Sequence, residues 1–299
     1  MAIPASSASA PTASVAGHVP AARRRRRLDM VRPVLTGWAL LVAVFLLAPL
    51  IIVFIDSIGV EQYVVFPPGG WSLHWYQVIP KYYLDGAILS VGLAVAAVAA
   101  ATVFAVPAGM AIARGSLPGR AAIDALLRSP VQIPLLISGV AFLQFYVLIR
   151  TLTGVTVTDS FVGLWIAHTI VVSPYLLTAV VARLARYPAS LDEAAYGLGA
   201  GPVRTFFDIT LPIISPAVAS GLFFAFLVSF DNVPTTVFLI QSGKTTLPLA
   251  IFYDTDQDLS RIQYAVGTIV TVVFTTLILV AMRWLRLLPS SASARRGGG

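Results

Sequence analysis

Long stretches without a charged side chain constrain this chain more than any other feature. Six runs of 21 to 28 residues contain no Asp, Glu, Lys or Arg and are rich in apolar side chains. About 20 such residues cross the hydrocarbon core of a membrane as a helix, and backbone groups in that core must be hydrogen-bonded within the segment. We therefore predict an all-α integral membrane protein with six transmembrane helices, at residues 34–55, 86–113, 129–149, 160–182, 209–230 and 262–282.

The composition supports this class and excludes several kinds of site. Hydrophobic residues make up 58% of the 299 residues and charged residues only 11%, whereas soluble domains carry about 25% charged residues. The chain has no cysteine, which excludes disulfides, thiolate metal sites, iron–sulfur clusters and cysteine nucleophiles. Gly92, Ala96 and Ala100 recur every four residues in the second predicted span, and this spacing predicts a closely packed helix face.

Both ends of the chain are predicted to be tails. Residues 1–32 read as a disordered, basic cytoplasmic tail, because Ala, Ser and Pro dominate its start and five consecutive arginines follow. The first apolar run is too long for a signal peptide. We therefore interpret the arginines as a membrane-surface anchor and not as a nucleic-acid-binding patch. Residues 33–285 form the predicted six-span domain, and residues 286–299 form a cytoplasmic C-terminal tail.

The loop charges predict the orientation. With the N-terminus in the cytoplasm, 16 of the 20 Lys and Arg residues fall on cytoplasmic segments, and only Lys81, Arg150, Lys244 and Arg261 fall outside. Cytoplasmic loops of membrane proteins carry an excess of basic residues. Both termini are therefore predicted to be cytoplasmic.

One polar segment, residues 188–212, separates the fourth and fifth spans. Ser190 stands three residues before Glu193, a capping-box spacing that predicts a helix start. Gly199 is a natural left-handed terminator, and Pro202 suits the first turn of a second short helix. A two-turn helix is marginal alone in water, so we expect a partner to hold it. The alternative is that Glu193 only caps the helix and the glycines only turn the chain.

The spacing of this segment resembles the cytoplasmic loop of the permease subunits of bacterial ABC importers. That loop reads Glu-Ala-Ala, three residues, Gly, nine residues, Ile, one residue, Leu-Pro. The matching residues here are Glu193, Ala194, Ala195, Gly199, Ile209, Leu211 and Pro212. The resemblance implies the type I ABC importer permease fold in a bacterial inner membrane, with this ATPase-coupling loop held in a groove of a cytoplasmic ATPase subunit.

The resemblance also implies a division of labour. The chain itself would be no enzyme and bind no cofactor, since ATP would be bound by the ATP-binding subunits. It lacks the Gly-x-x-x-x-Gly-Lys-Ser/Thr loop that cradles phosphates. Further implied partners are a second permease subunit, a soluble substrate-binding protein and membrane lipid, with no nucleic acid.

Residues 229–236 and 246–252 resemble, more narrowly, the second permease of spermidine/putrescine-type importers. This resemblance implies polyamines as the cargo. Three alternatives stay open: a permease for another substrate such as an inorganic anion or iron(III), an ion-coupled secondary transporter, and a membrane scaffold that transports nothing.

Asp231 and Asn232 are candidates for the substrate pathway. Asp231 interrupts an apolar run, and an acid in or near a membrane is by default a functional candidate that would suit a cationic substrate. Its alternative role is to cap the turn before Pro234. Gln144 and Tyr146, polar groups in the third span, are further pathway candidates.

Other polar groups receive structural interpretations. His168 is expected to be buried and hydrogen-bonded to a neighbouring helix, the alternative being a proton relay. Asp254, Asp256 and Asp258 alternate as in a calcium loop but lack its Gly and its distal Glu. We predict no metal site there, and instead a solvated acidic surface that meets the binding protein.

Overall fold

A computed structural model describes residues 21–63, 65–240, 243–257 and 259–287. In these ranges the regular secondary structure is helical, apart from two isolated β-bridges, Gly59 with Trp71 and Tyr63 with Ser260. Among the described residues, six helical segments are long and apolar enough to cross a membrane: Arg32–Ser57, Lys81–Arg114, Leu135–Thr153, Phe161–Leu184, Pro202–Phe230 and Arg261–Arg283. The prediction of an all-α, six-span chain is confirmed.

The chain divides into two units after Val53. The first unit contains most of helix α1 (Ala21–Ser57), whose side chains from Arg32 onward are almost all exposed, as suits a helix bathed in lipid. The predicted tail of residues 1–32 needs a correction, because helical backbone already begins at Ala21. Residues 1–20 of that tail lie outside the described residues.

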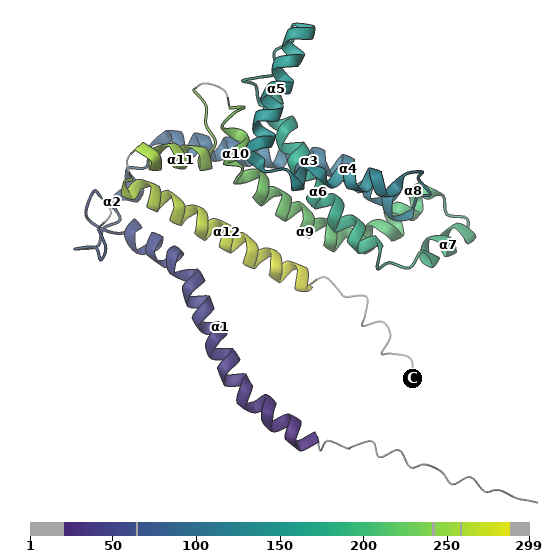
Figure 1. The fold of residues 1–299 in the computed structure, drawn as a ribbon, viewed down its shortest axis with the longest axis horizontal. Helices are drawn as coiled ribbons and strands as arrows, with labels where there is room; N and C mark the ends of the chain where they lie inside the picture. The colour runs from purple at the N-terminus through teal and green to yellow at the C-terminus, as the bar shows by residue number, and fades with distance from the viewer. Residues whose placement is uncertain (1–20, 64, 241–242, 258, 288–299) are drawn as a thin grey trace, which may run out of the picture. The chain divides into compact units, whose positions relative to one another are not determined.

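Three helices form the centre of the second unit (Figure 1): α3 (Lys81–Arg114), α6 (Phe161–Leu184) and α9 (Leu211–Phe230). Helix α3 packs through small side chains, with Ala94, Ala97 and Ala101 fully buried. The predicted packing face was wrong, since Gly92 is exposed with no atom within 4 Å of where a Cβ would lie, and Ala96 and Ala100 are only half-buried. Small residues line the packed face as expected, but on a different register of the helix.

The predicted third span is two helices. Helix α4 (Arg120–Gln132) ends before Pro134, and α5 (Leu135–Thr153) begins after it. Ile133 is extended at φ −90° and ψ 128°, the conformation that a following proline favours. The prediction of one span at residues 129–149 is therefore corrected to a shorter one within α5.

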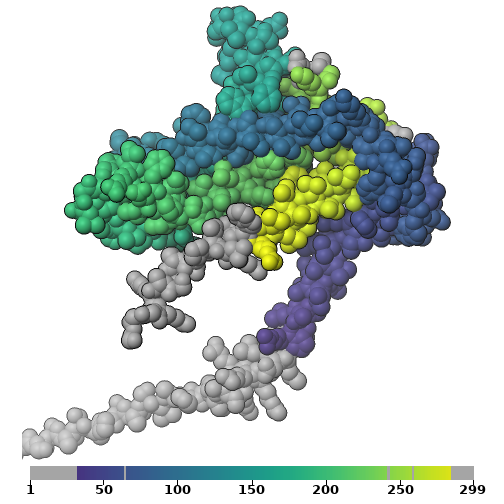
Figure 2. All heavy atoms as spheres, turned by 180° about the vertical axis from the view of Figure 1, so that it is seen from behind, coloured from purple at the N-terminus to yellow at the C-terminus, as the bar shows by residue number. Residues whose placement is uncertain are grey.

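Short elements mark the two ends of this unit. One end, which we call the α7 end, carries α7 (Ser190–Gly197) and α8 (Pro202–Thr205); the other, the α11 end, carries α2 (His74–Gln77), α10 (Val233–Thr236) and α11 (Leu247–Gln257) (Figure 1). Helix α12 (Arg261–Leu287) starts at the α11 end. Residues 288–299, most of the predicted C-terminal tail, lie outside the described residues. Figure 2 shows α3 (blue) lying along the opposite face, with the green α7–α8 segment at one end.

Candidate functional site

The start of α7 differs from the predicted capping box. The helix begins at Ser190, and the residue before it, Ala189, is already helical at φ −63° and ψ −24° with no side-chain cap. The backbone N–H groups of Asp192 and Glu193 donate to the Ala189 carbonyl. The capping-box prediction for Ser190 and Glu193 was wrong, because the chain turns into the helix one residue earlier.

The end of α7 is as predicted. Gly199 has φ +84°, and the Ala200 N–H donates to the Ala195 carbonyl at 3.0 Å while the Gly199 N–H donates to the Tyr196 carbonyl at 3.0 Å. These two bonds around a left-handed glycine form a Schellman motif. The prediction that Gly199 terminates this helix is confirmed.

The second predicted short helix is not separate. From Pro202, α8 runs through a π-helical turn, η1 (Phe206–Thr210), directly into α9. The Leu211 N–H donates to the Phe206 carbonyl across that turn. Ile209 lies in the π turn, and Leu211 and Pro212 open α9. The segment therefore joins the short helix α7 to a transmembrane helix that has a π turn near its start.

Helix α7 presents most of its surface to the outside. Glu193, Ala194 and Tyr196 are exposed, and Leu198 just beyond the helix is 90% exposed. Val203 at the start of α8 is also exposed. Several exposed apolar side chains within one short segment are typical of a protein-binding surface.

Sequence reasoning missed the inward side of α7. The Asp192 carboxylate accepts hydrogen bonds from the Tyr187 hydroxyl at 2.8 Å and the Thr210 hydroxyl at 3.1 Å. Arg114 at the end of α3 lies with its Nε 3.8 Å from the same carboxylate. Burial, followed by the bond to Asp192, raises the pKa of Tyr187 to about 12, so its hydroxyl stays protonated as a donor. Nothing in the spacing of these residues distinguishes them from ordinary loop residues.

A cavity of about 670 Å³ lies at the α11 end. It is lined by residues at the end of α9 and just after it, and by residues of α11 and α12. Asp231 and Asp256 line it together with Phe230 and Phe252. Both carboxylates belong to exposed residues, so they face a space that a solute can enter.

The other predicted pathway residues do not line this cavity. Asn232 is buried, and its Oδ1 accepts from the Thr235 N–H at 3.2 Å, which caps α10. The cap that the alternative interpretation assigned to Asp231 is thus made by Asn232. Gln144 is exposed on α5, while Tyr146 is buried with its hydroxyl donating to the Gly163 carbonyl at 2.7 Å. Their role in a pathway stays a prediction.

His168 is buried, as predicted, and bonds to its neighbours. Its Nδ1 lies 2.9 Å from the Ser229 hydroxyl and its Nε2 lies 3.1 Å from the Thr236 hydroxyl. Ser229 lies in the last turn of α9 and Thr236 ends α10. The imidazole therefore ties α6 to both sides of the turn that carries Asp231.

The predicted acidic surface needs a correction. Asp254 and Asp256 lie on α11, and the Asp254 carboxylate accepts from the hydroxyls of Tyr82 and Tyr83 at the start of α3. Asp254 therefore joins two helices instead of standing in solvent. Asp258 lies outside the described residues.

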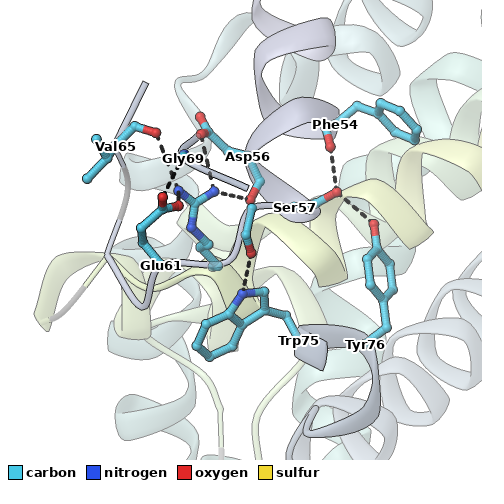
Figure 3. A network of polar contacts seen from close by, with 10 residues as sticks. Phe54, Asp56, Ser57, Glu61, Val65, Gly69, Trp75 and Tyr76 are labelled. Atoms are coloured by element: carbon cyan, nitrogen blue, oxygen red, sulfur yellow. Dashed lines mark hydrogen bonds and ion pairs between the residues drawn. The ribbon is translucent and has the colours of Figure 1, made fainter. Parts of the chain in front are cut away.

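A buried ion network closes the α11 end (Figure 3). Arg261, 0% exposed, donates from Nη1 to the Asp56 backbone carbonyl at 2.6 Å and lies 3.4 Å from the Asp56 carboxylate, which is 1% exposed. Its Nη2 donates to Glu61 at 2.9 Å. Backbone N–H groups of Glu61 and Gly69, assisted by Arg261, hold the pKa of Glu61 below its usual range. The network ties the loop after α1 to the start of α12.

Comparisons with known proteins agree on one family. Residues 105–291 match the family described as "Binding-protein-dependent transport system inner membrane component". The putrescine transport system permease protein PotI of Escherichia coli K12 is 33% identical over 214 residues, which cover 70% of this chain and 75% of PotI. The spermidine/putrescine permease PotC of Haemophilus influenzae is 29% identical over 70% of this chain and 79% of PotC.

Further relatives match in sequence or in fold. The molybdate/tungstate permease WtpB of Thermococcus kodakarensis is 28% identical over 68% of this chain and 79% of WtpB. A crystal structure of a bacterial ABC transporter that imports alginate aligns with a TM-score of 0.65 at 18% identity, over 94% of this chain and 100% of that chain. The family match over residues 105–291, the membrane-spanning helices and the identity with PotI all agree. The chain therefore belongs to the binding-protein-dependent transport system inner membrane component family, the multi-pass inner-membrane permeases of ABC importers.

Proposed function

We propose that this permease carries polyamines through the membrane, past the cavity that Asp231 and Asp256 line. The observation that carries the proposal is that two exposed carboxylates and two phenylalanine rings border one cavity. Polyamines are flexible chains with ammonium groups at intervals. Carboxylates attract such groups, and aromatic faces attract cations by about 0.5–2 kcal/mol each. The names of PotI and PotC agree with this cargo.

An anionic cargo is the runner-up, since WtpB is named for molybdate and tungstate. Two carboxylates at the border of the cavity disfavour it, because clefts lined by one sign of charge repel ions of the same sign. An ion-coupled secondary transporter would have no use for a helix held outside the membrane by a glycine turn. The cationic cargo therefore fits the cavity best.

The energy for transport would come from a separate ATPase. We propose that a cytoplasmic ATP-binding subunit holds the outward side of α7, where Glu193 stands among exposed apolar side chains. A second permease would complete the pathway, and a soluble binding protein would deliver the cargo at the α11 end. In this arrangement the α7 end and both termini face the cytoplasm.

Replacing Asp231, one of the two acids that line the cavity, should slow transport. Asp231→Asn removes one negative charge from the cavity, and we expect the maximal rate of putrescine uptake to fall about tenfold, the effect of losing roughly 1.4 kcal/mol of attraction. The binding protein selects the cargo, so the concentration for half-maximal uptake should change little. The control is Asp159→Asn, which removes the same charge from an exposed loop residue. An unchanged maximal rate in Asp231→Asn would exclude Asp231 from the pathway.

Two changes in the coupling loop should weaken ATPase binding. Glu193→Ala removes an exposed carboxylate from the proposed docking surface, and Gly199→Val forces a β-branched residue to φ +84°, which costs about 1–3 kcal/mol. We expect each to lower the amount of ATPase subunit that copurifies with this chain by about tenfold. Asp208→Ala, an exposed acid nearby that pairs with Arg204 on the same helix, is the control. Uptake that persists without the ATPase subunits would refute the importer mechanism.

A further inference from the structure

We propose that Asp192 is the positioning residue through which α7 moves the transmembrane helices. The inference rests on the proposed coupling of this chain to an ATPase. It concerns Asp192 on the inward side of α7, the residue that directly precedes the Glu-Ala-Ala pattern. A movement of α7 can drive transport only if the helix is fastened to the spans on that side.

Helix α7 has few inward contacts. Six of its eight residues are exposed, and only Ala195 and Asp192 are not. These two residues stand three positions apart and therefore share one face of the helix. Ala195 supplies a single methyl group to that contact. The Asp192 side chain, 16% exposed, is the polar group of α7 that reaches the rest of the unit.

The partners of Asp192 come from three different helices or their ends. Tyr187 follows α6, Thr210 ends the π turn that leads into α9, and Arg114 ends α3. Both hydroxyls donate to the same carboxylate oxygen, Oδ1. Hydrogen bonds to a charged acceptor are shorter and roughly twice as strong as neutral ones. One carboxylate thus joins α7 to all three helices that form the centre of the unit.

The partners are themselves held firmly, so a force on Asp192 has something rigid to act on. Tyr187 is buried in an apolar cluster with Leu184, Ile214 and Val218 from α6 and α9. The Arg114 guanidinium lies 4.7 Å over the Tyr187 ring, and its Nη2 donates to the Tyr187 carbonyl at 2.8 Å. Thr210 is buried as well. The carboxylate therefore connects a loosely packed helix to a closely packed core.

The π turn fits this role. Its end places Thr210 against Asp192, so the hydroxyl reaches the carboxylate from within the transmembrane helix itself. Single π turns inside α-helices are rare and are frequently found at functional sites. Displacement of α7 would therefore pull directly on the first turn of the α9 span.

The test compares two replacements of Asp192 in the complete transporter, purified through this chain and reconstituted in liposomes. Asp192→Asn keeps an oxygen that accepts from Tyr187 and Thr210, whereas Asp192→Leu has similar size and accepts nothing. We expect both variants to bind the ATPase subunits normally, because Glu193 and its exposed neighbours are unaltered. In Asp192→Leu the putrescine imported per ATP hydrolysed should fall about tenfold, within the range of coupling between distant sites. Asp192→Asn should stay within about threefold of the unaltered protein.

If Asp192→Leu and the unaltered protein import the same amount of putrescine per ATP hydrolysed, the proposal is overturned. A loss of ATPase binding with that amount unchanged would also overturn it, because it would make Asp192 part of the docking surface. If Asp192→Leu does not assemble, the test uses Tyr187→Phe and Thr210→Val, each of which removes one hydroxyl and keeps the shape of the side chain. A fall in putrescine imported per ATP hydrolysed in these variants supports the proposal, and an unchanged value overturns it. The surface variant Asp208→Asn is the matched control, since Asp208 is exposed in the same segment.

A second measurement separates this proposal from the choice of cargo. The chain has no cysteine, so Gly197→Cys on α7 and Ser220→Cys on α9 can carry spin labels on two exposed positions. We expect a narrow distribution of distances between the labels with Asp192 or Asp192→Asn, and a broad one with Asp192→Leu. If putrescine is not imported by the unaltered protein, the cargo proposal fails while this comparison still decides the positioning role. Equal widths in all three proteins would overturn it.

Discussion

Arg261→Met should lower the free energy of unfolding by about 3–5 kcal/mol, the cost of leaving a buried charge without its partner. Methionine fills a similar length but offers no positive charge and no donor. The Asp56 carboxylate, 1% exposed, would then remain buried with no cation beside it, and the Asp56 carbonyl would lose its donor. The loop after α1 and the start of α12 are held together at this point, so the α11 end should loosen first.

The measurement is thermal unfolding of the purified protein in lipid nanodiscs. Arg150→Met is the matched control, because Arg150 is exposed on α5 and its loss should change stability by no more than about 0.5 kcal/mol. Asp56→Asn combined with Arg261→Met should recover part of the loss, since the double variant buries no lone charge. Similar unfolding temperatures for the Arg261 and Arg150 variants would contradict the structural role of this network.

The packing of Arg261 against Gly59 is a second sign that this network is closely fitted. A Cβ atom on Gly59 would lie 1.9 Å from the Arg261 Nη1, far inside van der Waals contact. The guanidinium thus fits against bare backbone. From the sequence, Arg261 and Asp56 were only the charges that flank two apolar runs, 205 positions apart.

The spans could be predicted because membrane insertion acts on each segment separately. Charges and apolar length are local properties, so each of the six predicted spans begins and ends within about two turns of a membrane-spanning helix of the structure. The third span was predicted to start six residues too early, because Pro134 lies in an apolar run and interrupts the backbone without changing its hydropathy. The side-chain cap predicted for Ser190 was wrong for a similar reason, because the helical backbone of Ala189 takes the place of that cap.

The candidate sites likewise divide into those that local sequence reveals and those that form only when distant helices meet. The coupling loop was recognisable because its residues are close together in sequence and their spacing is regular. Asp231 was visible as a charge in an apolar run. Asp192 with Arg114, and Asp231 with Asp256, become pairs only when helices distant in sequence meet. A single sequence carries no sign of which acid in a loop turns inward.

The last prediction concerns the turn that carries Asp231. His168 is 1% exposed and holds Ser229 on one side of that turn and Thr236 on the other. His168→Ala removes both contacts and leaves a void, and we expect it to lower the free energy of unfolding by about 2–4 kcal/mol. Thr236 also donates to the Asn232 carbonyl, so the loss should free Asn232 and, with it, the position of Asp231. Putrescine uptake should therefore fall even at temperatures where the protein stays folded.

His168→Gln tests whether the hydrogen bonds of His168 are what stabilise the fold and hold Asp231 in place. Its amide can bond one of the two hydroxyls, so uptake and the unfolding temperature should both recover in part. His74→Ala, which alters an exposed histidine on α2, should leave both unchanged. Uptake at the full rate by folded His168→Ala would mean that the turn holds its shape without the imidazole, and Asp231 would then owe its position to the Asn232 cap alone. A joint loss of uptake and stability, partly restored by glutamine, would show instead that a histidine in the middle of α6 determines where the cavity acid stands.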